Sequence, residues 1–537
     1  MIKKMDEGKK ALSRRGFIKD ASIIVGGISI ASLNMGAQSP PKPPKKWDYE
    51  ADVVVVGYGG AGGAAAIEAA DAGASVILLE KLPFPGGSSI MSAGAFAAPG
   101  TPMQKGLGID DSPQKMYDYC MLAGMGVTDP ELTKVICENA LDTWQWLTDL
   151  GGGDISKLWM MVGFSGSPYA TPETVIPRWH IPPMTPVLGG AWEHLAVQQA
   201  VTARRSITVK LDASASDLFC SDTGKVIGVK AVISGIEKSI RAKKAVVLTT
   251  GDFARNDEMS MAFSLNNYIA VKRTATGGTG DGIKMATQLG AALRCMEGAM
   301  NNGLVPTKVK ANGKATAGML FEEMPYTNPH ILINIHGLRY VKEHPEVKGT
   351  LYPVPYWTYY YLGYETFLQD DHKAYAVFDE KLARQGGEKV CPIFSHNLAD
   401  EVAAGWVIQA DSIDGLAQKL NVPMTALSNT VRIYNEDVGK GVDRLYGRTG
   451  NLVTIDTSPF YAVEMTFNTI QSHGGVQTNG RAQVVNTKGG IIPCLYAAGS
   501  TVGGFLGPFY QHSGLGICQA YTMGRIAGRN AAAEARQ

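Results

Sequence analysis

The sequence of 537 residues has little that points to a metal centre or a strongly charged partner. Its seven cysteines are scattered and none has the C-x-x-C spacing of iron–sulfur, zinc-ribbon or covalent haem sites, so no metal site is predicted. The 50 basic and 49 acidic residues nearly cancel, which leaves no footprint for nucleic acid. Charged residues make up only 18% and hydrophobic residues 45%, so the chain can bury a large core and is not disordered.

The first 39 residues have the pattern of an export signal. Residues 13–19 read S-R-R-G-F-I-K, and the weakly apolar run over residues 21–37 is shorter than the ~20 residues that cross a bilayer. A twin arginine before such a run resembles a twin-arginine (Tat) signal, with cleavage near Ser39. We therefore expect export by the Tat translocase to the periplasm or cell exterior, or a membrane tether if the signal is retained. Residues 40–47 read as a Pro- and Lys-rich tether.

Glycine is abundant, with 63 residues, and its first cluster has a nucleotide-binding context. The run D-V-V-V-V ending at residue 56 is typical of a strand buried on both faces, and it is followed by G-Y-G-G-A-G-G, an Ala-rich helical stretch and a second strand ending at Glu80. In this dinucleotide fingerprint Gly57 makes the turn, Gly59 admits the pyrophosphate and Gly62 allows helix and strand to pack closely. Glu80 is placed to accept a hydrogen bond from a ribose hydroxyl.

The fingerprint alone does not distinguish FAD from NAD, but further glycine clusters favour FAD. They are K-L-P-F-P-G-G-S-S at residues 81–89, V-V-L-T-T-G at 246–251, T-G-D-G at 279–282 and L-Y-A-A-G at 495–499. Segments so far apart in the sequence can contact one ligand only if it is long, with adenosine at one end and isoalloxazine at the other. The sequence therefore predicts FAD as the cofactor.

Several of these segments resemble those of one flavoprotein family. They are the glycine fingerprint, E-K-x-x-x-x-G-G-S-S, A-K-K-A-V-V-L-T-T-G-D-F-A-R-N, G-T-G-D-G-I-K-M-A, L-I-N-I-H-G-L-R-Y and I-I-P-C-L-Y-A-A-G-S, in order between about residues 52 and 531. Together they resemble the FAD-dependent fumarate reductase/succinate dehydrogenase flavoprotein family, which includes the 3-ketosteroid dehydrogenases. The resemblance implies hydride exchange between flavin N5 and an activated C–C bond. With no histidine near Met91, we expect noncovalent FAD.

The resemblance also implies an α/β fold (α+β overall), with a Rossmann-like FAD-binding domain interrupted by an α+β capping domain. We expect the FAD-binding domain over residues 48–299 and 471–537 and the capping domain over residues 300–470. The residues expected to bind FAD are Gly57, Gly59, Gly60, Ala61, Gly62, Glu80, Lys81, Gly86, Gly87, Ser88, Ser89, Thr250, Gly251, Asp281, Gly499, Ser500 and Gly516. Two positions depart from the family pattern: Asp252 replaces a second glycine, and Ser500 replaces an acid.

The positions at which the family's fumarate reductases hold a dicarboxylate are changed in this chain. Tyr326, three residues after Glu323, replaces an arginine, and Gln471 replaces a histidine. Residues 343–347 and 507–516 lack the arginines that the family has there. Because two carboxylates need fixed cationic partners, these changes argue against a dicarboxylate substrate.

The tyrosines instead resemble the 3-ketosteroid dehydrogenase branch. Tyr510 and Gly514 have the Y-x-x-x-G spacing with which, in that branch, a hydroxyl and a backbone amide bind the ketone oxygen. Tyr326 is the expected proton donor or acceptor at Cα. Glu323 or His512 is expected to help by hydrogen bonding, because a phenol is a weak base at its usual pKa of ~10. The alternative for each of these side chains is simple packing in the core.

Three functions remain open from the sequence. The first is an FAD-dependent enone reductase or ketosteroid-dehydrogenase-like desaturase for a small apolar carbonyl substrate, with the tyrosine-rich residues 352–364 either walling the substrate or packing the cap. The second is a respiratory enoate (fumarate- or urocanate-type) reductase, which requires Arg339 or Arg273 to turn inward as a carboxylate clamp. The third is a non-catalytic flavin electron carrier. With no haem or cluster motif, the electron donor or acceptor is expected to be external, from the quinone pool or a cytochrome.

Overall fold

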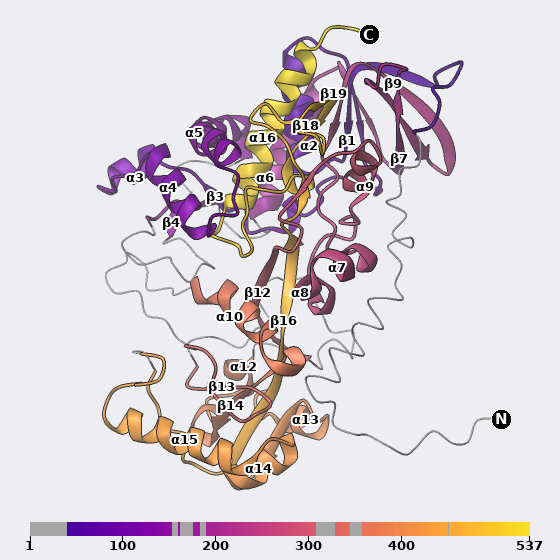
Figure 1. Ribbon diagram of the computed structural model, residues 1–537. Helices are drawn as coiled ribbons and strands as arrows, with labels where there is room; N and C mark the ends of the chain where they lie inside the picture. Colours follow the sequence, from indigo (N-terminus) through magenta and orange to yellow (C-terminus); the bar gives the residue numbers. More distant parts are fainter. Residues whose placement is uncertain are drawn as a thin grey trace, which may run out of the picture.

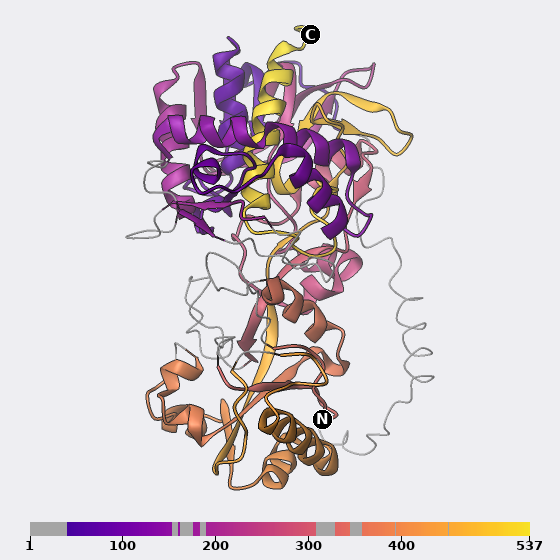
Figure 2. The ribbon, with the colours of Figure 1, turned by 90° about the vertical axis from the view of Figure 1, so that its left-hand side faces the viewer.

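The computed structural model describes residues 40–152, 159–161, 176–182, 189–307, 328–343, 357–391, 394–448 and 451–537. The predicted signal, Glu323, Tyr326 and residues 352–356 of the tyrosine-rich stretch lie outside the described residues. Two lobes joined by a narrower middle are visible in perpendicular views (Figures 1 and 2). No helix of the described residues is both long and apolar enough to span a membrane.

The first lobe is built on a sheet with a parallel, buried centre. In the described residues it has eight strands, in the order β18 (Gln483–Val485), β19 (Ile491–Ala497), β9 (Ile236–Leu248), β1 (Tyr49–Val56), β2 (Val76–Leu79) and β6 (Ile207–Lys210), with β8 (Val226–Ile233) beside β9 and β7 (Ala213–Cys220) beside β8. The pairs from β19 to β6 are parallel, and β18, β8 and β7 are antiparallel to their neighbours. The β-branched centre of β1 is fully buried, as the sequence predicts for a strand covered on both faces.

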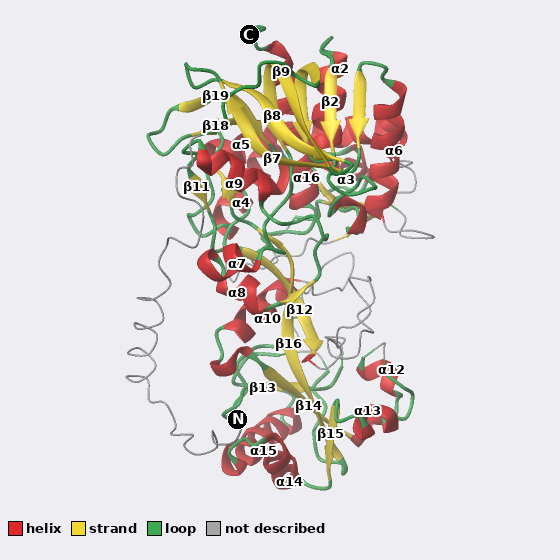
Figure 3. Cartoon of the chain, turned by 90° about the vertical axis from the view of Figure 1, so that its right-hand side faces the viewer, coloured by secondary structure: helices red, strands yellow, loops and turns green. Residues whose placement is uncertain are grey.

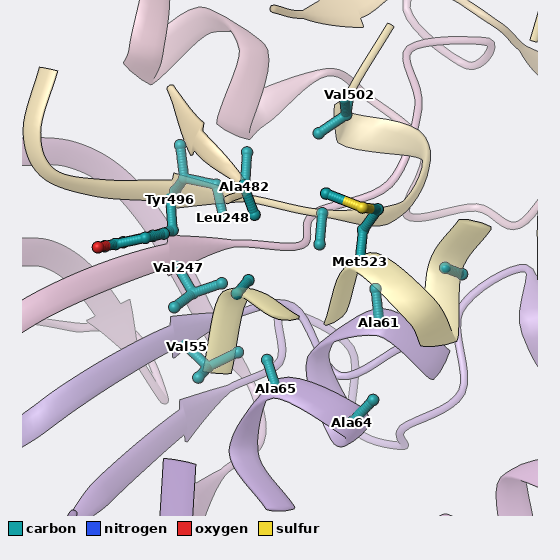
Figure 4. Packing of buried hydrophobic residues seen from close by; sticks show 14 of the residues in the cluster. Val55, Ala61, Ala64, Ala65, Val247, Leu248, Ala482, Tyr496, Val502 and Met523 are labelled. Atoms are coloured by element: carbon teal, nitrogen blue, oxygen red, sulfur yellow. The ribbon is translucent and has the colours of Figure 1, made fainter. Parts of the chain in front are cut away.

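Two helices from opposite ends of the sequence pack on this sheet and on each other. They are α2 (Gly60–Asp71) and α16 (Leu515–Ala533). A Cβ atom on Gly524 would lie 2.4 Å from the Ala61 carbonyl oxygen, and one on Gly528 would lie 2.2 Å from the Ala65 carbonyl oxygen. The two backbones are thus in direct contact, and small alanine side chains fill the space between α2 and the strands (Figure 4).

The other elements of this lobe surround the sheet. The helices are α3 (Pro102–Gly106), α4 (Pro113–Ala123), α5 (Pro130–Leu147), α6 (Gly189–Ala203), α7 (Asp257–Phe263), α8 (Leu265–Ile269) and α9 (Asp281–Gln288). Short helical turns are η1 (Ser89–Met91), η2 (Thr148–Gly152) and η6 (Gly499–Thr501). Two small antiparallel sheets pair β3 (Phe96–Ala97) and β4 (Trp159–Met161) with β5 (Trp179–Ile181), and β11 (Leu293–Arg294) with β17 (Gly475–Val476).

The second lobe is organised around one long strand, β16 (Phe460–Ser472). It pairs with β14 (Ala374–Asp379), β15 (Val407–Ala410), β12 (Ala299–Pro306) and β10 (Val271–Lys272), and β13 (Ile331–Ile333) extends the sheet beyond β14. Around it lie α10 (Trp357–Phe367), η5 (Asp370–His372), α11 (Glu380–Ala383), α12 (Gly387–Val390), α13 (Ala399–Ala403), α14 (Ile413–Leu420) and α15 (Met424–Gly439). Because β10 joins this sheet, the sheet includes a strand that precedes the expected boundary at residue 300.

The C-terminal end of β16 reaches the first lobe, as Figures 1 and 3 show. The backbone N–H of Phe253 donates to the Ser472 hydroxyl oxygen at 3.1 Å. The strand therefore carries Gln471 and Ser472 from the cap sheet to the edge of the first lobe. The mixed architecture confirms the predicted α/β fold class.

Candidate active site

A cavity in the first lobe brings together glycine-rich segments from distant parts of the sequence. Predicted cofactor residues that line it are Gly57, Gly59, Gly60, Ala61, Glu80, Lys81, Gly87, Ser88, Ser89, Thr250, Gly251, Asp281, Gly499 and Ser500. Many of them follow the ends of β1, β2, β9 and β19, which all face the same edge because these strands are parallel. Ligands of open α/β sheets bind at that edge.

The start of α2 is shaped to hold a phosphate group. Its N-cap residue, Gly59, offers no side-chain oxygen to the first amides, and the first turn has no acidic residue. The Gly60 N–H donates to the Ser89 hydroxyl at 3.1 Å, and no acidic residue of the first turn compensates the partial positive charge with which α2 faces the cavity. Gly57 has φ of +104°, and a Cβ there would lie 2.3 Å from the Thr249 carbonyl oxygen, so only glycine fits this turn.

Two charged residues after β2 are held firmly at the cavity wall. The Glu80 carboxylate accepts hydrogen bonds from the backbone amides of Tyr58 and Leu82, each at 2.9 Å. The Lys81 ammonium donates to Thr279 at 2.6 Å and to Asp281 at 2.7 Å, which ties this loop to the start of α9. These contacts fix the part of the wall where the sequence places the ribose.

Three predicted cofactor residues do not line the cavity, and packing explains two of these glycines. A Cβ on Gly62 would lie 1.8 Å from the Gly57 carbonyl oxygen, and one on Gly86 would lie 2.3 Å from Ile90. The third, Gly516, lies against Tyr510. Lining residues that the sequence reasoning did not select are Val56, Leu79, Leu82, Ala213, Ala215, Thr249, Ala275, Gly277, Gly278 and Ala520.

Asp252, which departs from the family pattern, is buried just behind this wall. Its Oδ1 accepts from the backbone N–H of Ala254 at 3.2 Å, and its Oδ2 has no hydrogen-bond partner among the described residues. Burial raises the pKa of this carboxyl to about 7, against the opposing effects of backbone amides and of the charges of Arg255 and Lys272. A Cβ on Gly278 would lie 2.4 Å from Asp252 Oδ1, so the acid in this position leaves no room for a side chain at this cavity glycine.

Tyr510 is buried beside the N-terminus of α16. The backbone N–H of Gly516 donates to its hydroxyl oxygen at 3.0 Å, and the amides of Gly514 and Leu515 also act on it. Burial raises the pKa of Tyr510 to about 12, and these amides oppose the rise. The amides at the start of α16 thus bind the phenol oxygen in this structure, and the joint binding of a ketone oxygen by Tyr510 and the Gly514 amide stays a prediction.

Gln471 and Tyr510 lie on either side of Gly516, close to the cavity. The cavity residue Ser500 donates to Gln471 Oε1 at 3.4 Å. A Cβ on Gly516 would lie 3.4 Å from the Tyr510 hydroxyl and 3.7 Å from the Gln471 amide nitrogen, so both side chains flank this glycine. His473 lies nearby with its Nδ1 bonded to the Gly507 carbonyl at 2.8 Å, and burial lowers its pKa to about 4. The end of β16 thus meets the cavity next to Tyr510.

His512 is buried two residues after Tyr510. Its Nδ1 donates to the Ser513 carbonyl at 2.6 Å, and its Nε2 has no hydrogen-bond partner in the described residues. The imidazole instead packs edge-on against Tyr119, with ring centroids 5.7 Å apart. The predicted help from His512 concerns the proton exchange assigned to Tyr326, which lies outside the described residues, so it stays a prediction.

The structure also shows how Arg339 and Tyr364 of the cap are placed. Arg339 makes ion pairs with Glu343 at 2.6 Å and with Asp443 at 2.8 Å, all deeply buried, so it is not a carboxylate clamp facing the cavity. Tyr364 packs edge-on against Phe509, with ring centroids 4.4 Å apart. Through this contact Tyr364 packs α10 of the cap against the loop that carries Tyr510. Of the two roles considered for the tyrosine-rich stretch, Tyr364 therefore has the packing role.

The sequence matches a family of FAD-binding proteins. Residues 52–517 match the family described as FAD binding domain. The chain is 31% identical to a fumarate reductase (cytochrome) of Shewanella frigidimarina over 488 residues, 90% of this chain and 77% of that protein. It is 29% identical to a urocanate reductase of Eggerthella lenta over 523 residues, 96% of this chain and 80% of that protein.

A solved structure with the same fold is also similar over most of the chain. It is the 3-ketosteroid-delta4-(5alpha)-dehydrogenase from Rhodococcus jostii RHA1 in complex with 4-androstene-3,17-dione, with a TM-score of 0.72 and 28% identity, covering 92% of this chain and 100% of that one. The N-terminus of α2, with no acidic residue in its first turn, and the glycine-lined cavity fit FAD as the cofactor. The chain therefore belongs to the FAD binding domain family and is an FAD-dependent oxidoreductase.

Proposed function

We propose that this flavoenzyme exchanges a hydride with the C–C bond beside a ketone. Its relatives and structural neighbours are reductases and dehydrogenases, which supports the coarser assignment to flavin-dependent chemistry at C=C bonds. The observation that carries the finer proposal is the Tyr510 hydroxyl, a buried neutral donor whose oxygen is already satisfied by the amides of α16. A ketone oxygen needs such a donor, whereas a dicarboxylate needs cations.

The cofactor and the tyrosines have separate roles in this reaction. FAD, when bound, supplies the hydride-exchanging centre. Tyr510 donates its hydrogen bond to the carbonyl oxygen and stabilises the negative charge that develops there as Cβ gains a hydride. Its pKa of about 12 keeps it protonated at neutral pH, so it is suited to donate rather than to act as a base. We assign proton exchange at Cα to Tyr326, supported by Glu323, on the resemblance to the family.

We also propose that the protein is exported and exchanges electrons with an external partner. The S-R-R-G-F-I-K segment supports export of the folded, FAD-loaded protein by the Tat translocase to the periplasm or cell exterior. One relative is a fumarate reductase named for a cytochrome, which supports a cytochrome or the quinone pool as the external electron partner. Noncovalent FAD is part of the same proposal.

An anaerobic flavin assay tests this function. The purified holoprotein is reduced to the flavin hydroquinone, and enones, enoates and quinones are added separately while the absorbance of oxidised flavin is recorded. We expect enones to reoxidise the flavin, or saturated ketones to bleach the oxidised flavin in the reverse direction. Reoxidation by fumarate or urocanate alone would overturn the proposal in favour of an enoate reductase. A flavin that exchanges electrons only with quinones would favour the electron carrier.

A further inference from the structure

Asp252 lies between the cofactor cavity and the end of the long cap strand. It directly follows Gly251, which lines the cavity, and it is only 2% exposed. On one side, a Cβ on the cavity residue Gly278 would lie 2.4 Å from Asp252 Oδ1, so the carboxyl group is in contact with the cavity wall. On the other side, the backbone N–H of Phe253 donates at 3.1 Å to the hydroxyl oxygen of Ser472, at the end of β16. A glycine backbone therefore separates the carboxyl group from the cavity.

The negative charge of Asp252 has little compensation in this position. Its Oδ1 accepts one hydrogen bond, from the Ala254 N–H at 3.2 Å, and its Oδ2 has none among the described residues. Two cations act on it, Arg255 on the same loop and Lys272 on β10, but each of them donates its hydrogen bond to a backbone carbonyl. Residues 275–280 of the cavity wall contain no titratable side chain. A buried carboxylate with so few partners is costly, so the neutral acid is favoured.

Asp252 consequently changes its protonation close to neutral pH. Burial raises its pKa to about 7, and the amides of Ala254 and Ser472 and the charges of Arg255 and Lys272 oppose this rise. At neutral pH the carboxyl group is therefore divided between its neutral and ionised forms. A carboxyl group in this state responds to a change of charge in the adjoining cavity.

The redox-active end of FAD belongs to the part of the cavity near Asp252. Glu80 is placed for the adenosine ribose, so the isoalloxazine belongs where the cavity meets the cap. At this meeting point Ser500 of the cavity donates to Gln471 Oε1 at 3.4 Å, and the next residue of β16, Ser472, is bonded to the loop of Asp252. Any charge that the flavin gains is therefore expected to act on this carboxyl group.

Reduction gives the cofactor such a charge. A flavin that gains two electrons and one proton gains one negative charge. At an effective dielectric constant of about 20, a unit charge about 10 Å away raises the pKa of a carboxyl group by about one. At about pH 7.5, roughly half of the Asp252 side chains then take up one additional proton.

We propose that Asp252 binds a proton from solvent when the flavin in the cavity is reduced and releases it when the flavin is reoxidised. The electron pair enters the flavin from its reductant together with one proton, and a second proton converts the Asp252 carboxylate to the neutral acid. Reoxidation removes the electron pair with the first proton and frees the second to solvent. Asp252 acts through the flavin rather than on the substrate, so this role holds whichever C–C bond the enzyme uses.

The pH dependence of the flavin midpoint potential tests this role. Holoprotein is reduced slowly and anaerobically in equilibrium with a reference dye, at intervals from about pH 5.5 to about pH 9.5. For a two-electron couple, each proton taken up changes the potential by about 30 mV for a tenfold change in proton concentration. We expect the slope to correspond to about one proton at both ends of the range and to about 1.5 protons at about pH 7.5, where Asp252 adds its own.

Variants assign the additional proton to Asp252. Asp252→Asn keeps an oxygen that accepts from the Ala254 N–H but cannot bind a proton, so its slope should correspond to one proton at every pH. Asp252→Gly, with the residue that the family has at this position, should give the same result and decides if asparagine disturbs folding. Asp257→Asn is the matched control, because Asp257 is exposed at the start of α7, where water screens its charge, and it should keep the wild-type maximum.

A slope of one proton at every pH in the wild type would overturn the role of Asp252, as would a maximum that persists in both Asp252 variants. A slope that falls steadily from two protons to one would show that the flavin itself takes up the second proton, and would equally refute it. Infrared difference spectra give a second readout: on reduction at about pH 7.5, a neutral carboxyl C=O band should appear in the wild type and in Asp257→Asn but in neither Asp252 variant. None of these measurements uses a substrate, so a failure of ketones in the flavin reoxidation assay leaves their result unaffected.

Discussion

The contact between α2 and α16 gives a sharp prediction, because it joins two backbones rather than two side chains. Gly524→Ala adds a methyl group 2.4 Å from the Ala61 carbonyl oxygen and 3.0 Å from Ala61 Cα. A backbone oxygen cannot rotate aside as a side chain can. The helices must therefore separate by about 1 Å to restore ordinary contact, and Ala61 lines the cofactor cavity.

The change in the free energy of unfolding is the cost of overpacking minus the gain in helix propensity. Overpacking of a core costs roughly 1–3 kcal/mol, and the rigid oxygen places this case in the upper part of that range. Replacing a helical glycine by alanine returns about 1 kcal/mol through helix propensity. We expect Gly524→Ala to lower the free energy of unfolding of the first lobe by about 1–2 kcal/mol and to weaken FAD binding, because the displacement reaches the cavity wall.

Thermal unfolding followed by flavin fluorescence and by far-ultraviolet circular dichroism measures both effects. Gly439→Ala is the matched control, because Gly439 is also a helical glycine, at the end of α15, but has no atom within 4 Å of its added Cβ. The control should leave FAD release unchanged and stabilise the cap slightly. A Gly524→Ala protein that releases FAD at the same temperature as the wild type, or higher, would refute the backbone-contact reasoning.

Three further predictions concern single residues. Tyr510→Phe should lower the rate of flavin oxidation by a ketone-conjugated substrate about 10²–10³-fold in stopped-flow measurements, with FAD content unchanged, since one oxyanion donor contributes about this much; an unaltered rate would contradict the donor role. Asp252 has a pKa of about 7 in the folded protein against 3.8 ordinarily, so folding stability should fall as pH rises from about 4 to about 7. Asp252→Asn should remove that decline in urea unfolding curves, and an unchanged pH profile would count against burial as its cause. Arg339→Gln should destabilise the cap by about 3–5 kcal/mol, because Asp443 loses its buried cation and Glu343 keeps only Arg448 at 3.9 Å. A substrate-binding defect without a loss of stability would instead support Arg339 as the carboxylate clamp.

The cofactor cavity was predictable because its segments carry local signals. Gly57, Gly251 and Gly499 each follow a buried strand, and each adopts a positive φ that favours glycine. Parallel strands have their carboxyl ends at one edge of the sheet. A glycine turn that directly follows each strand therefore lies at that same edge, so these turns are expected to come together. The strand–helix–strand order of residues 52–80 agrees with the α/β class that the family resemblance implies.

The parts that sequence reasoning missed depend on tertiary contacts without a local signal. Ala213 and Ala215 line the cavity from an antiparallel strand, and alanine in a strand predicts nothing about a ligand. The Y-x-x-x-G spacing identified Tyr510 but could not show that the α16 amides turn toward the phenol oxygen. The pairing of Arg178 with Asp111 joins residues 67 positions apart and has no sequence pattern.

The cavity is lined by residues from both ends of the sequence, and this affects when it can form during synthesis. The ribosome releases Gly57 early in translation, whereas Gly499 and Ala520, which complete the wall, emerge only after the whole cap has been synthesised. A nascent chain that stops before β19 carries the glycine fingerprint without the surfaces that enclose the cofactor. Affinity for FAD therefore arises late in synthesis, and the cap has time to begin folding before the flavin site can close around its ligand.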